Sequence, residues 1–167
     1  MKKFLKELYP YIIIVIVVVL FRTFIATPVS VDGSSMYPTL HDKDILILNK
    51  LDNSYERFDV VVINYGNTKL VKRIIGLPNE KIEYKKNILY INNKRVSDMT
   101  DIKTYDFTLE DLYDIEVIPN EYYFVMGDNR TNSLDSRDNR VGLIKKEDIV
   151  GTVKLRLYPF NKIGTFK

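Results

Sequence analysis

Hydrophobic and polar positions divide the chain into an apolar N-terminal segment and a longer region of mixed pattern. Residues 8–21 carry no charged side chain and are dominated by isoleucine and valine, and apolar residues continue to position 26 beyond Arg22. About 20 apolar residues usually cross a bilayer, so this segment is near the lower limit of length. The pattern predicts a transmembrane anchor over residues 8–26, with Arg22 extending to the membrane interface.

The charges before this segment predict its orientation. Three lysines precede the apolar run, at positions 2, 3 and 6. By the positive-inside rule, residues 1–7 form a cytoplasmic N-terminus and residues 27–167 form an extracytoplasmic domain at the cell membrane. A cleavable export signal has a similar basic start and apolar run. We favour a retained anchor, because Pro28 would directly follow the most plausible cleavage point.

After Pro28 the pattern changes to short apolar or alternating runs, which are typical of β-strands. Turn-forming Gly and Asn residues separate many of them, and no long amphipathic helix competes with this interpretation. The expected fold class is therefore mainly β, with antiparallel sheets and one N-terminal transmembrane helix. The most polar region, residues 79–119, is expected to form a small inserted cap that contains a hairpin over residues 81–96. The predicted strands cover residues 29–31, 44–48, 59–63, 70–75, 81–83, 88–91, 122–126 and 149–157.

Composition excludes several kinds of chemistry. A chain of 167 residues has the length of one domain, and its 25 basic and 22 acidic residues give a net charge of only +3, too balanced for a nucleic-acid-binding surface. It contains no cysteine and one histidine, His41, so thiol nucleophiles, disulfides and multi-histidine metal sites are excluded. We expect no metal and no cofactor. Serine, threonine, lysine and carboxylate chemistry remain.

A serine nucleophile needs a base, and the sequence offers two candidates. His41 stands beside a highly charged turn, which indicates a surface residue. Lys72 stands among Leu70, Val71 and two isoleucines of a predicted strand, and burial there would lower its pKa. A decrease of about two pKa units costs on the order of 3 kcal/mol, which a folded β domain can tolerate. Lys72 is therefore the stronger candidate.

Four short motifs support this pairing together. The runs are SSMYPTL at residues 34–40, LVKRIIGLP at 70–78, GDNR at 127–130 and SLDSR at 133–137. In this order and spacing they resemble the type I signal peptidases, especially their short Gram-positive branch. The resemblance implies a membrane-bound serine endopeptidase that removes signal peptides from exported preproteins. It also implies that Ser35 is the nucleophile, since it directly precedes Met36, and that Lys72 is the general base.

The resemblance implies further roles in the site. The backbone N–H of Ser35 is expected to bind the oxyanion, in a loop marked by Gly33, although many relatives place a hydroxyl residue at the position of Gly33. The dyad would be supported by Ser133, which would orient the Lys72 amine, and by the ion pairs Asp135–Arg137 and Asp128–Arg73. The alternative, an aspartic dyad of Asp128 and Asp135, requires two carboxyl groups that share a proton, which nearby arginines would disfavour.

An extended substrate could add as a strand between exposed β segments. Candidate walls are residues 29–31 and 69–71, and the family's preference for small residues implies an Ala-x-Ala cleavage pattern. The expected partners are signal peptides and the lipid bilayer, whereas the oligomeric state is left open. The residues expected to line shallow apolar pockets are Val29, Val31, Met36, Leu40, Leu70 and Val71.

Two other functions are compatible with parts of this pattern. One is a self-cleaving Ser/Lys protease like the SOS-response repressors, although these lack an apolar anchor and carry a DNA-binding region. The other is a catalytically silent, membrane-anchored domain that holds secreted chains in the same groove. The presence of both Ser35 and Lys72 favours an enzyme.

Overall fold

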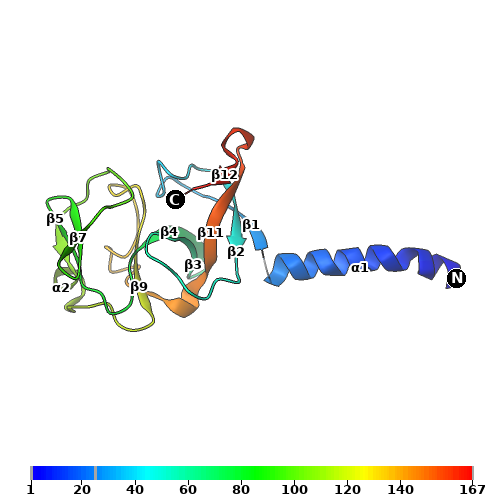
Figure 1. Ribbon diagram of the computed structural model, residues 1–167, viewed down its shortest axis with the longest axis horizontal. Coiled ribbons are helices and arrows are strands. Elements are labelled where there is room, and N and C mark those ends of the chain that lie inside the picture. Colours follow the sequence, from blue (N-terminus) through cyan, green and yellow to red (C-terminus); the bar gives the residue numbers. More distant parts are fainter. Residues whose placement is uncertain (1, 25, 167) are drawn as a thin grey trace.

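The computed structural model describes residues 2–24 and 26–166, and within them two antiparallel sheets carry most of the ordered structure (Figure 1). The larger sheet has the order β1-β2-β11-β3-β4-β9-β10, with β12 beside β11. Its strands are β1 (Ala26–Ser30), β2 (Ile45–Asn49), β3 (Val60–Tyr65), β4 (Thr68–Gly76), β9 (Tyr122–Met126), β10 (Ile144–Lys145), β11 (Ile149–Tyr158) and β12 (Gly164–Thr165).

The smaller sheet has the order β7-β6-β5-β8. It lies within residues 79–119, the segment predicted to form an inserted cap, and we call this segment the cap. Its elements are β5 (Ile82–Lys85), β6 (Ile88–Ile91), β7 (Lys94–Val96), β8 (Phe107–Thr108) and the short helix α2 (Leu109–Tyr113). Two single-turn 3-10 helices follow in the large sheet's half of the chain, at Lys146–Asp148 and Phe160–Lys162.

The predicted fold class is confirmed in its main part, because every predicted strand corresponds to an observed one within a few residues. The antiparallel arrangement is also confirmed. The strands absent from the prediction, β7, β8, β10 and β12, have at most three residues each, too few for an alternating pattern to emerge.

Strand β3 shows why the larger sheet is stable. Its run of apolar residues is buried on both faces, because successive side chains of a strand point to opposite sides. Val60 and Val62 pack into one apolar core, while Val61 and Ile63 pack into another. The first of these cores also contains Val31, Met36 and Leu40 of the loop after β1, so packing against the sheet holds that loop in place.

The cap shares a third apolar core with the end of the larger sheet. Ile82, Tyr84 and Phe107 of the cap pack with Phe124 and Met126 of β9. Figure 1 accordingly shows the cap strands beside β9, at the end of the molecule opposite to the N-terminal helix. Because β9 leads directly into the GDNR motif, the cap lies next to one of the motifs that suggested a function.

The N-terminal helix α1 (Lys2–Phe24) extends away from the β domain (Figure 1). In the part of the chain that the structure describes, no helix meets the combined length and apolarity that a membrane crossing requires. The helix also stops short of the predicted anchor's end, since Ala26 belongs to β1 and Ile25 lies outside the described residues. The predicted transmembrane helix over residues 8–26 is therefore not found.

Candidate active site

Ser35 and Lys72 meet at the centre of the candidate site. Ser35 lies in the loop after β1 and Lys72 lies in β4, and a hydrogen bond of 2.7 Å joins Lys72 Nζ to Ser35 Oγ. Ser34, by contrast, is exposed, and its hydroxyl accepts a long 3.4 Å hydrogen bond from Asn132 Nδ2. The geometry thus distinguishes the two neighbouring serines and brings Ser35, the predicted one, to the lysine.

The environment of Lys72 favours its neutral form. Only 2% of the residue is exposed, and this burial lowers the pKa of Lys72 to about 8. The charge of Asp135 opposes the decrease and that of Arg137 adds to it. A buried amine with a pKa near neutrality can accept a proton from a hydroxyl group at its 2.7 Å distance.

Local contacts hold the loop that carries Ser35. Met36 and Leu40 are buried in the apolar core beneath it, and the Leu40 N–H donates to the Met36 carbonyl at 2.9 Å. Gly33 has a positive φ of 88°, a conformation that glycine adopts without strain. Its N–H donates to Asp42 Oδ1 at 2.8 Å, so the predicted oxyanion donor at Gly33 has its backbone N–H engaged elsewhere.

The GDNR turn binds the same loop from the other side. The Asn129 N–H donates to the Ser35 carbonyl at 3.0 Å, and Asn129 Nδ2 donates to the Ser34 carbonyl at 3.1 Å. Gly127 makes this approach possible, because a Cβ at this position would overlap both the Ser35 carbonyl oxygen and the Ser133 hydroxyl. The two carbonyl groups around the candidate nucleophile are therefore fixed by a second segment of the chain.

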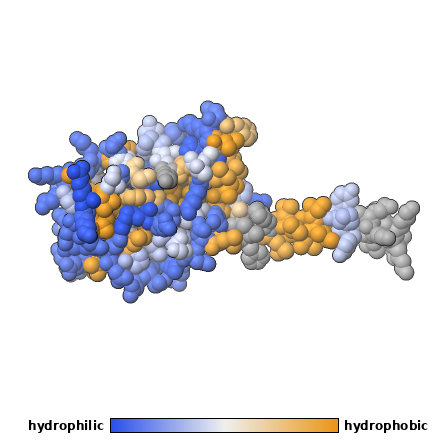
Figure 2. Space-filling view, in the orientation of Figure 1, coloured by the Kyte–Doolittle hydropathy of each residue, from blue (hydrophilic) through white to orange (hydrophobic). Residues whose placement is uncertain are grey.

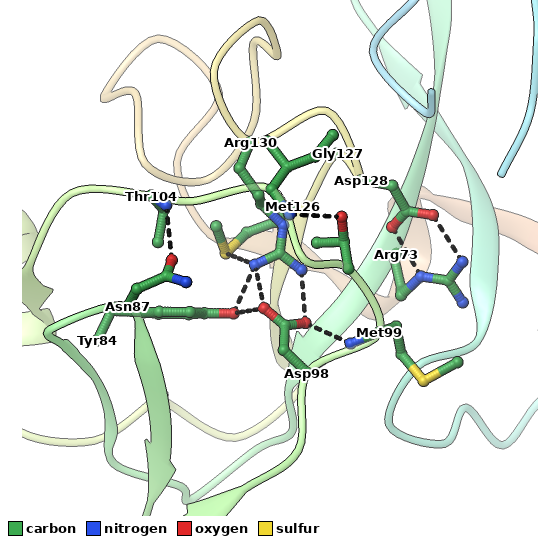
Figure 3. Close-up of polar contacts among 12 residues, drawn as sticks. Arg73, Tyr84, Asn87, Asp98, Met99, Thr104, Met126, Gly127, Asp128 and Arg130 are labelled. Atoms are coloured by element: carbon green, nitrogen blue, oxygen red, sulfur yellow. Dashed lines mark hydrogen bonds and ion pairs between the residues drawn. The ribbon is translucent and has the colours of Figure 1, made fainter. Parts of the chain in front are cut away.

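Two ion pairs lie beneath this arrangement. Arg73 donates to both oxygens of Asp128, at 2.8 and 2.7 Å, and both side chains are completely buried; Figure 3 shows this pair. Arg137 donates to both oxygens of Asp135, at 2.9 and 2.8 Å. Burial alone would raise the pKa of Asp135, but its bonds to Arg137 outweigh this effect and lower it. These contacts leave no shared proton between Asp128 and Asp135, so the aspartic-dyad alternative does not fit.

Ser133 packs against Gly127, and no hydrogen bond joins its hydroxyl to Lys72. The hydroxyl is buried and lies near the Asp135 carboxyl group, whose pKa it helps to lower. Asp135 Oδ2 instead accepts from the Gly127 N–H at 2.9 Å. The orienting bond from Ser133 to Lys72 is thus absent from this geometry, and the role implied for Ser133 stays a prediction.

A cavity of about 270 Å³ opens beside the dyad. Five of the six residues predicted to line the substrate pockets border it, namely Val29, Val31, Met36, Leu70 and Val71. Leu40 does not, because its side chain is fully buried in the core. Ser30 and Lys69, which lie within the predicted walls, also border the cavity, as do Asp32 and Val62, which were not predicted there.

The strands beside this cavity have unpaired edges. Within the described residues, β1 pairs only with β2, and β9 pairs with β4 only from Arg73 onward. Residues 69–71 of β4 therefore pair with β3 on one side alone. The cavity lies between two strand edges that present free backbone groups.

Two further groups were considered from the sequence. His41, which was expected at the surface, is partly buried and packs edge-on against Tyr37, with ring centroids 5.3 Å apart. Across residues 2–24 and 26–166, no cluster of three or more histidine or carboxylate side chains is arranged to hold a metal ion.

Sequence reasoning missed two parts of the site. Asn129 was regarded only as part of an ordinary turn, although its backbone and side chain bind the nucleophile loop. Arg130 ends the same motif and reaches into the cap, where it contacts Asp98 and Tyr84. The place of GDNR among the four motifs was the one indication in the sequence that these two residues belong to the site.

Comparison with known proteins agrees with this geometry. The family model described as signal peptidase, peptidase S26, matches residues 3–158. The chain is 44% identical to a signal peptidase I of Bacillus amyloliquefaciens, over 93% of this chain and 89% of the relative. It is 41% identical to signal peptidase I S of Bacillus subtilis, over 97% and 93%.

A solved structure is similar as well. The crystal structure of a signal peptidase I from Enterococcus faecalis has a TM-score of 0.54 and 34% identity, and the match covers 59% of this chain and 96% of that one. The family match spans nearly the whole chain, and the predicted motifs all fall within it. The chain therefore belongs to the signal peptidase family, peptidase S26, as an enzyme of the type I signal peptidases.

Proposed function

We propose that this enzyme removes N-terminal signal peptides from exported preproteins, with Ser35 as nucleophile and Lys72 as general base. One observation carries the proposal: Lys72 Nζ lies 2.7 Å from Ser35 Oγ and is almost fully buried. A lysine in water is protonated at neutral pH and cannot accept a proton. Burial lowers the pKa of Lys72 to about 8, so a useful fraction is neutral near physiological pH.

The reaction has two halves. In the first, Ser35 Oγ attacks the scissile carbonyl carbon while its proton moves to the Lys72 amine, and the resulting ammonium protonates the departing amino group of the mature protein. In the second, Lys72 accepts a proton from water as the water attacks the acyl-enzyme, and the proton returns to Ser35 Oγ as the signal peptide leaves. Lysine thus serves as base and acid in both halves.

The negative charge that develops on the substrate oxygen needs a preorganised donor. The backbone N–H of Ser35 is the proposed donor. The hydrogen bonds from Asn129 to the carbonyls of Ser34 and Ser35 fix the two peptide planes that flank the Cα of Ser35, and the N–H lies in the first of them. The identity of a second donor is left open: Gly33 has no side chain to offer, and its N–H donates to Asp42.

The substrate is proposed to bind as an added strand between β1 and β4. Both edges carry free backbone groups next to the dyad, and such edges pair readily with extended peptides. The cavity of about 270 Å³ between them is apolar on the sides formed by Val29, Leu70 and Val71. A small apolar cavity favours short side chains, in agreement with an Ala-x-Ala pattern.

Attachment to a membrane is proposed through α1. Its described apolar side chains from Leu8 to Leu20 are between 39% and 67% exposed, and Figure 2 shows the helix as a hydrophobic projection from a largely hydrophilic domain. A lipid phase would cover this surface. Shared attachment would also raise the local concentration of a substrate whose apolar segment lies in the same membrane. The extracytoplasmic position of the domain stays a prediction.

The test is cleavage of a precursor with an Ala-x-Ala site by detergent-solubilised protein. Ser35→Ala and Lys72→Ala should be inactive but folded, whereas Ser34→Ala should still cut. Product identity is checked by mass spectrometry and folding by circular dichroism. Activity that survives Ser35→Ala would refute the proposed nucleophile. Wild-type protein that binds the precursor without cutting it would favour the binding-domain alternative.

A further inference from the structure

A buried polar cluster joins the cap to the GDNR turn. Arg130 donates to both oxygens of Asp98, at 2.6 and 2.7 Å, and to the Tyr84 hydroxyl at 2.5 Å. Tyr84 in turn donates to Asp98 at 2.6 Å, so the three side chains form a closed set of bonds. Figure 3 shows that Arg130 points from the turn toward Asp98, while Tyr84 approaches from β5.

Arg130 lies at the buried side of this cluster, and Asp98 lies at its partly exposed side. The Arg130 side chain is 0% exposed and that of Asp98 is 16% exposed. Burying a cation is unfavourable unless it is paired and hydrogen-bonded, and Asp98 supplies the carboxylate that pairs with Arg130. The charge of Arg130 therefore fixes where its guanidinium group can lie relative to the cap.

The cap contacts the 127–130 turn at two points, and Asn129 connects that turn to the loop that carries Ser35. Asn129, the neighbour of Arg130, binds the carbonyls of Ser34 and Ser35. The Arg130 carbonyl accepts a 2.6 Å hydrogen bond from Arg137, which also donates to Thr104 of the cap at 2.9 Å. The cap thus holds the catalytic turn at two points, through Asp98 and through Thr104.

The need to hold the cap against the larger sheet does not by itself explain the Arg130–Asp98 ion pair. The cap already shares an apolar core with Ile75, Phe124 and Met126 of the larger sheet. Replacing a buried ion pair by well-packed apolar groups is often neutral or stabilising, so the pair is a poor device for stability. It is, however, directional, because its bidentate geometry allows one arrangement of the guanidinium.

We propose that Asp98 is a positioning residue for catalysis: through Arg130 it holds the 127–130 turn in the place where Asn129 fixes the backbone around Ser35. This inference rests on the proposed function, because it concerns the rate of the same reaction. Asp98 itself does not contact the dyad. The cap would then act as a support for the nucleophile loop and not only as a surface insertion.

The experiment compares five variants in the precursor-cleavage assay, including Asp98→Glu, which keeps the charge of Asp98. Asp98→Asn removes the charge with little change of shape, and Tyr84→Phe removes one hydroxyl while keeping the Arg130–Asp98 pair. Thr104→Val removes the second link to the turn. Asp101→Asn, an exposed carboxylate of the same loop, is the matched control. Each kcat and KM is measured on protein that circular dichroism shows to be folded at the assay temperature.

The expected result for Asp98→Asn is a fall in kcat of at least tenfold with KM within twofold of wild type, because a misplaced nucleophile loop affects the chemical step. Asp98→Glu should recover part of this loss, and Asp101→Asn should match wild type. Folded Asp98→Asn with an unchanged kcat would overturn the inference, as would a change in KM alone. If Asp98→Asn does not fold, Asp98→Glu carries the test, because its longer side chain displaces the carboxylate that pairs with Arg130; a wild-type kcat in folded Asp98→Glu would then overturn the inference.

The two proposals fail in different ways. If wild-type protein does not cut the precursor, the proposed function is wrong. If wild-type protein cuts it and folded Asp98→Asn cuts equally fast, only the positioning role of Asp98 is wrong.

Discussion

The pH dependence of cleavage tests the state of Lys72 most directly. Because the neutral amine is the proposed base, kcat/KM should follow the fraction of Lys72 that is deprotonated in the free enzyme. Burial lowers the pKa of Lys72 to about 8, and the opposing charges of Asp135 and Arg137 modify this value only secondarily. The rate should therefore rise on the alkaline side of neutrality and then level off.

The size of the rise follows from the same pKa of about 8. Roughly one tenth of Lys72 is neutral at pH 7, one half at pH 8 and nine tenths at pH 9, so kcat/KM should rise about tenfold between pH 7 and pH 9. A lysine with an ordinary pKa near 10.4 would give a rise of about 100-fold over the same range, without a plateau. The two cases differ by about a factor of ten.

The assay is cleavage of a precursor peptide at concentrations below KM, in buffers of constant ionic strength from pH 6 to pH 10. The peptide should contain no group that titrates in this range near the cut. Lys69 borders the same cavity but is exposed, so Lys69→Ala is a suitable control. In this variant the midpoint of the pH profile should stay at the wild-type position.

A flat profile between pH 7 and pH 9 in folded protein would refute Lys72 as the base. A continuous rise through pH 10 would show that the amine is not desolvated as the structure indicates. If the midpoint moves in Lys69→Ala, the titrating group is Lys69 and not Lys72. Only a midpoint near 8 that is insensitive to Lys69 agrees with the burial of Lys72.

Three further predictions concern the groups around the dyad. Lys72→Met should abolish cleavage but stabilise the fold by about 3 kcal/mol at pH 7, because the pKa of Lys72 is lowered to about 8 in the folded protein and protonation of this lysine opposes folding. In urea unfolding, the stability difference between the variant and wild type should decrease as the pH rises from 8 to about 10.5. Asn129→Ala should lower kcat roughly 10- to 100-fold without unfolding, because the side-chain bond beside Ser35 is lost, and steady-state kinetics measure this. Asp128→Asn should destabilise the protein by about 3–5 kcal/mol, because it leaves the fully buried Arg73 without a counter-ion, and a decrease of roughly 10 °C in the thermal midpoint would be expected.

The strands near the dyad were predictable because their apolar runs are long. The run around Lys72 has apolar neighbours on both sides, so its place in a buried strand follows from the pattern alone. The order of the motifs added the pairing of Ser35 with Lys72, which no local pattern contains. The motifs thus led to the Ser35–Lys72 contact, the two ion pairs beneath it and most of the cavity lining, but not to the contacts with the cap.

The cap contacts were not predictable for a physical reason. Residues 79–119 are rich in Lys, Asn and Asp, a composition typical of solvated loops, and this suggested no catalytic role. Asp98 is nevertheless largely buried, because Arg130, which is 32 positions further along the chain, pairs with it. Such a contact depends on how β9 packs against the cap. The sequence around Asp98 or around Arg130, taken alone, does not indicate it.

Two wrong expectations have a similar origin. Leu40 was expected in the substrate pocket because it follows Met36 in a motif, but the turn closed by the Leu40 N–H and the Met36 carbonyl leaves the Leu40 side chain in the core. The predicted span over residues 8–26 counted apolar residues across Arg22, whereas the chain enters β1 at Ala26. In both cases the residues were correctly identified as apolar, but the local backbone geometry determines where their side chains lie.

The charges around Lys72 explain why the SLDSR motif contains both an acid and an arginine. A lone carboxylate near the amine would raise the pKa of Lys72 and keep it protonated, whereas Arg137 acts in the opposite direction. Paired with Arg137, Asp135 can still accept the Gly127 N–H and fix the turn, while its effect on Lys72 is partly cancelled. Neutralising Asp135 alone should therefore lower the pKa of Lys72 further while it loosens the turn, so the pH profile and kcat should change independently.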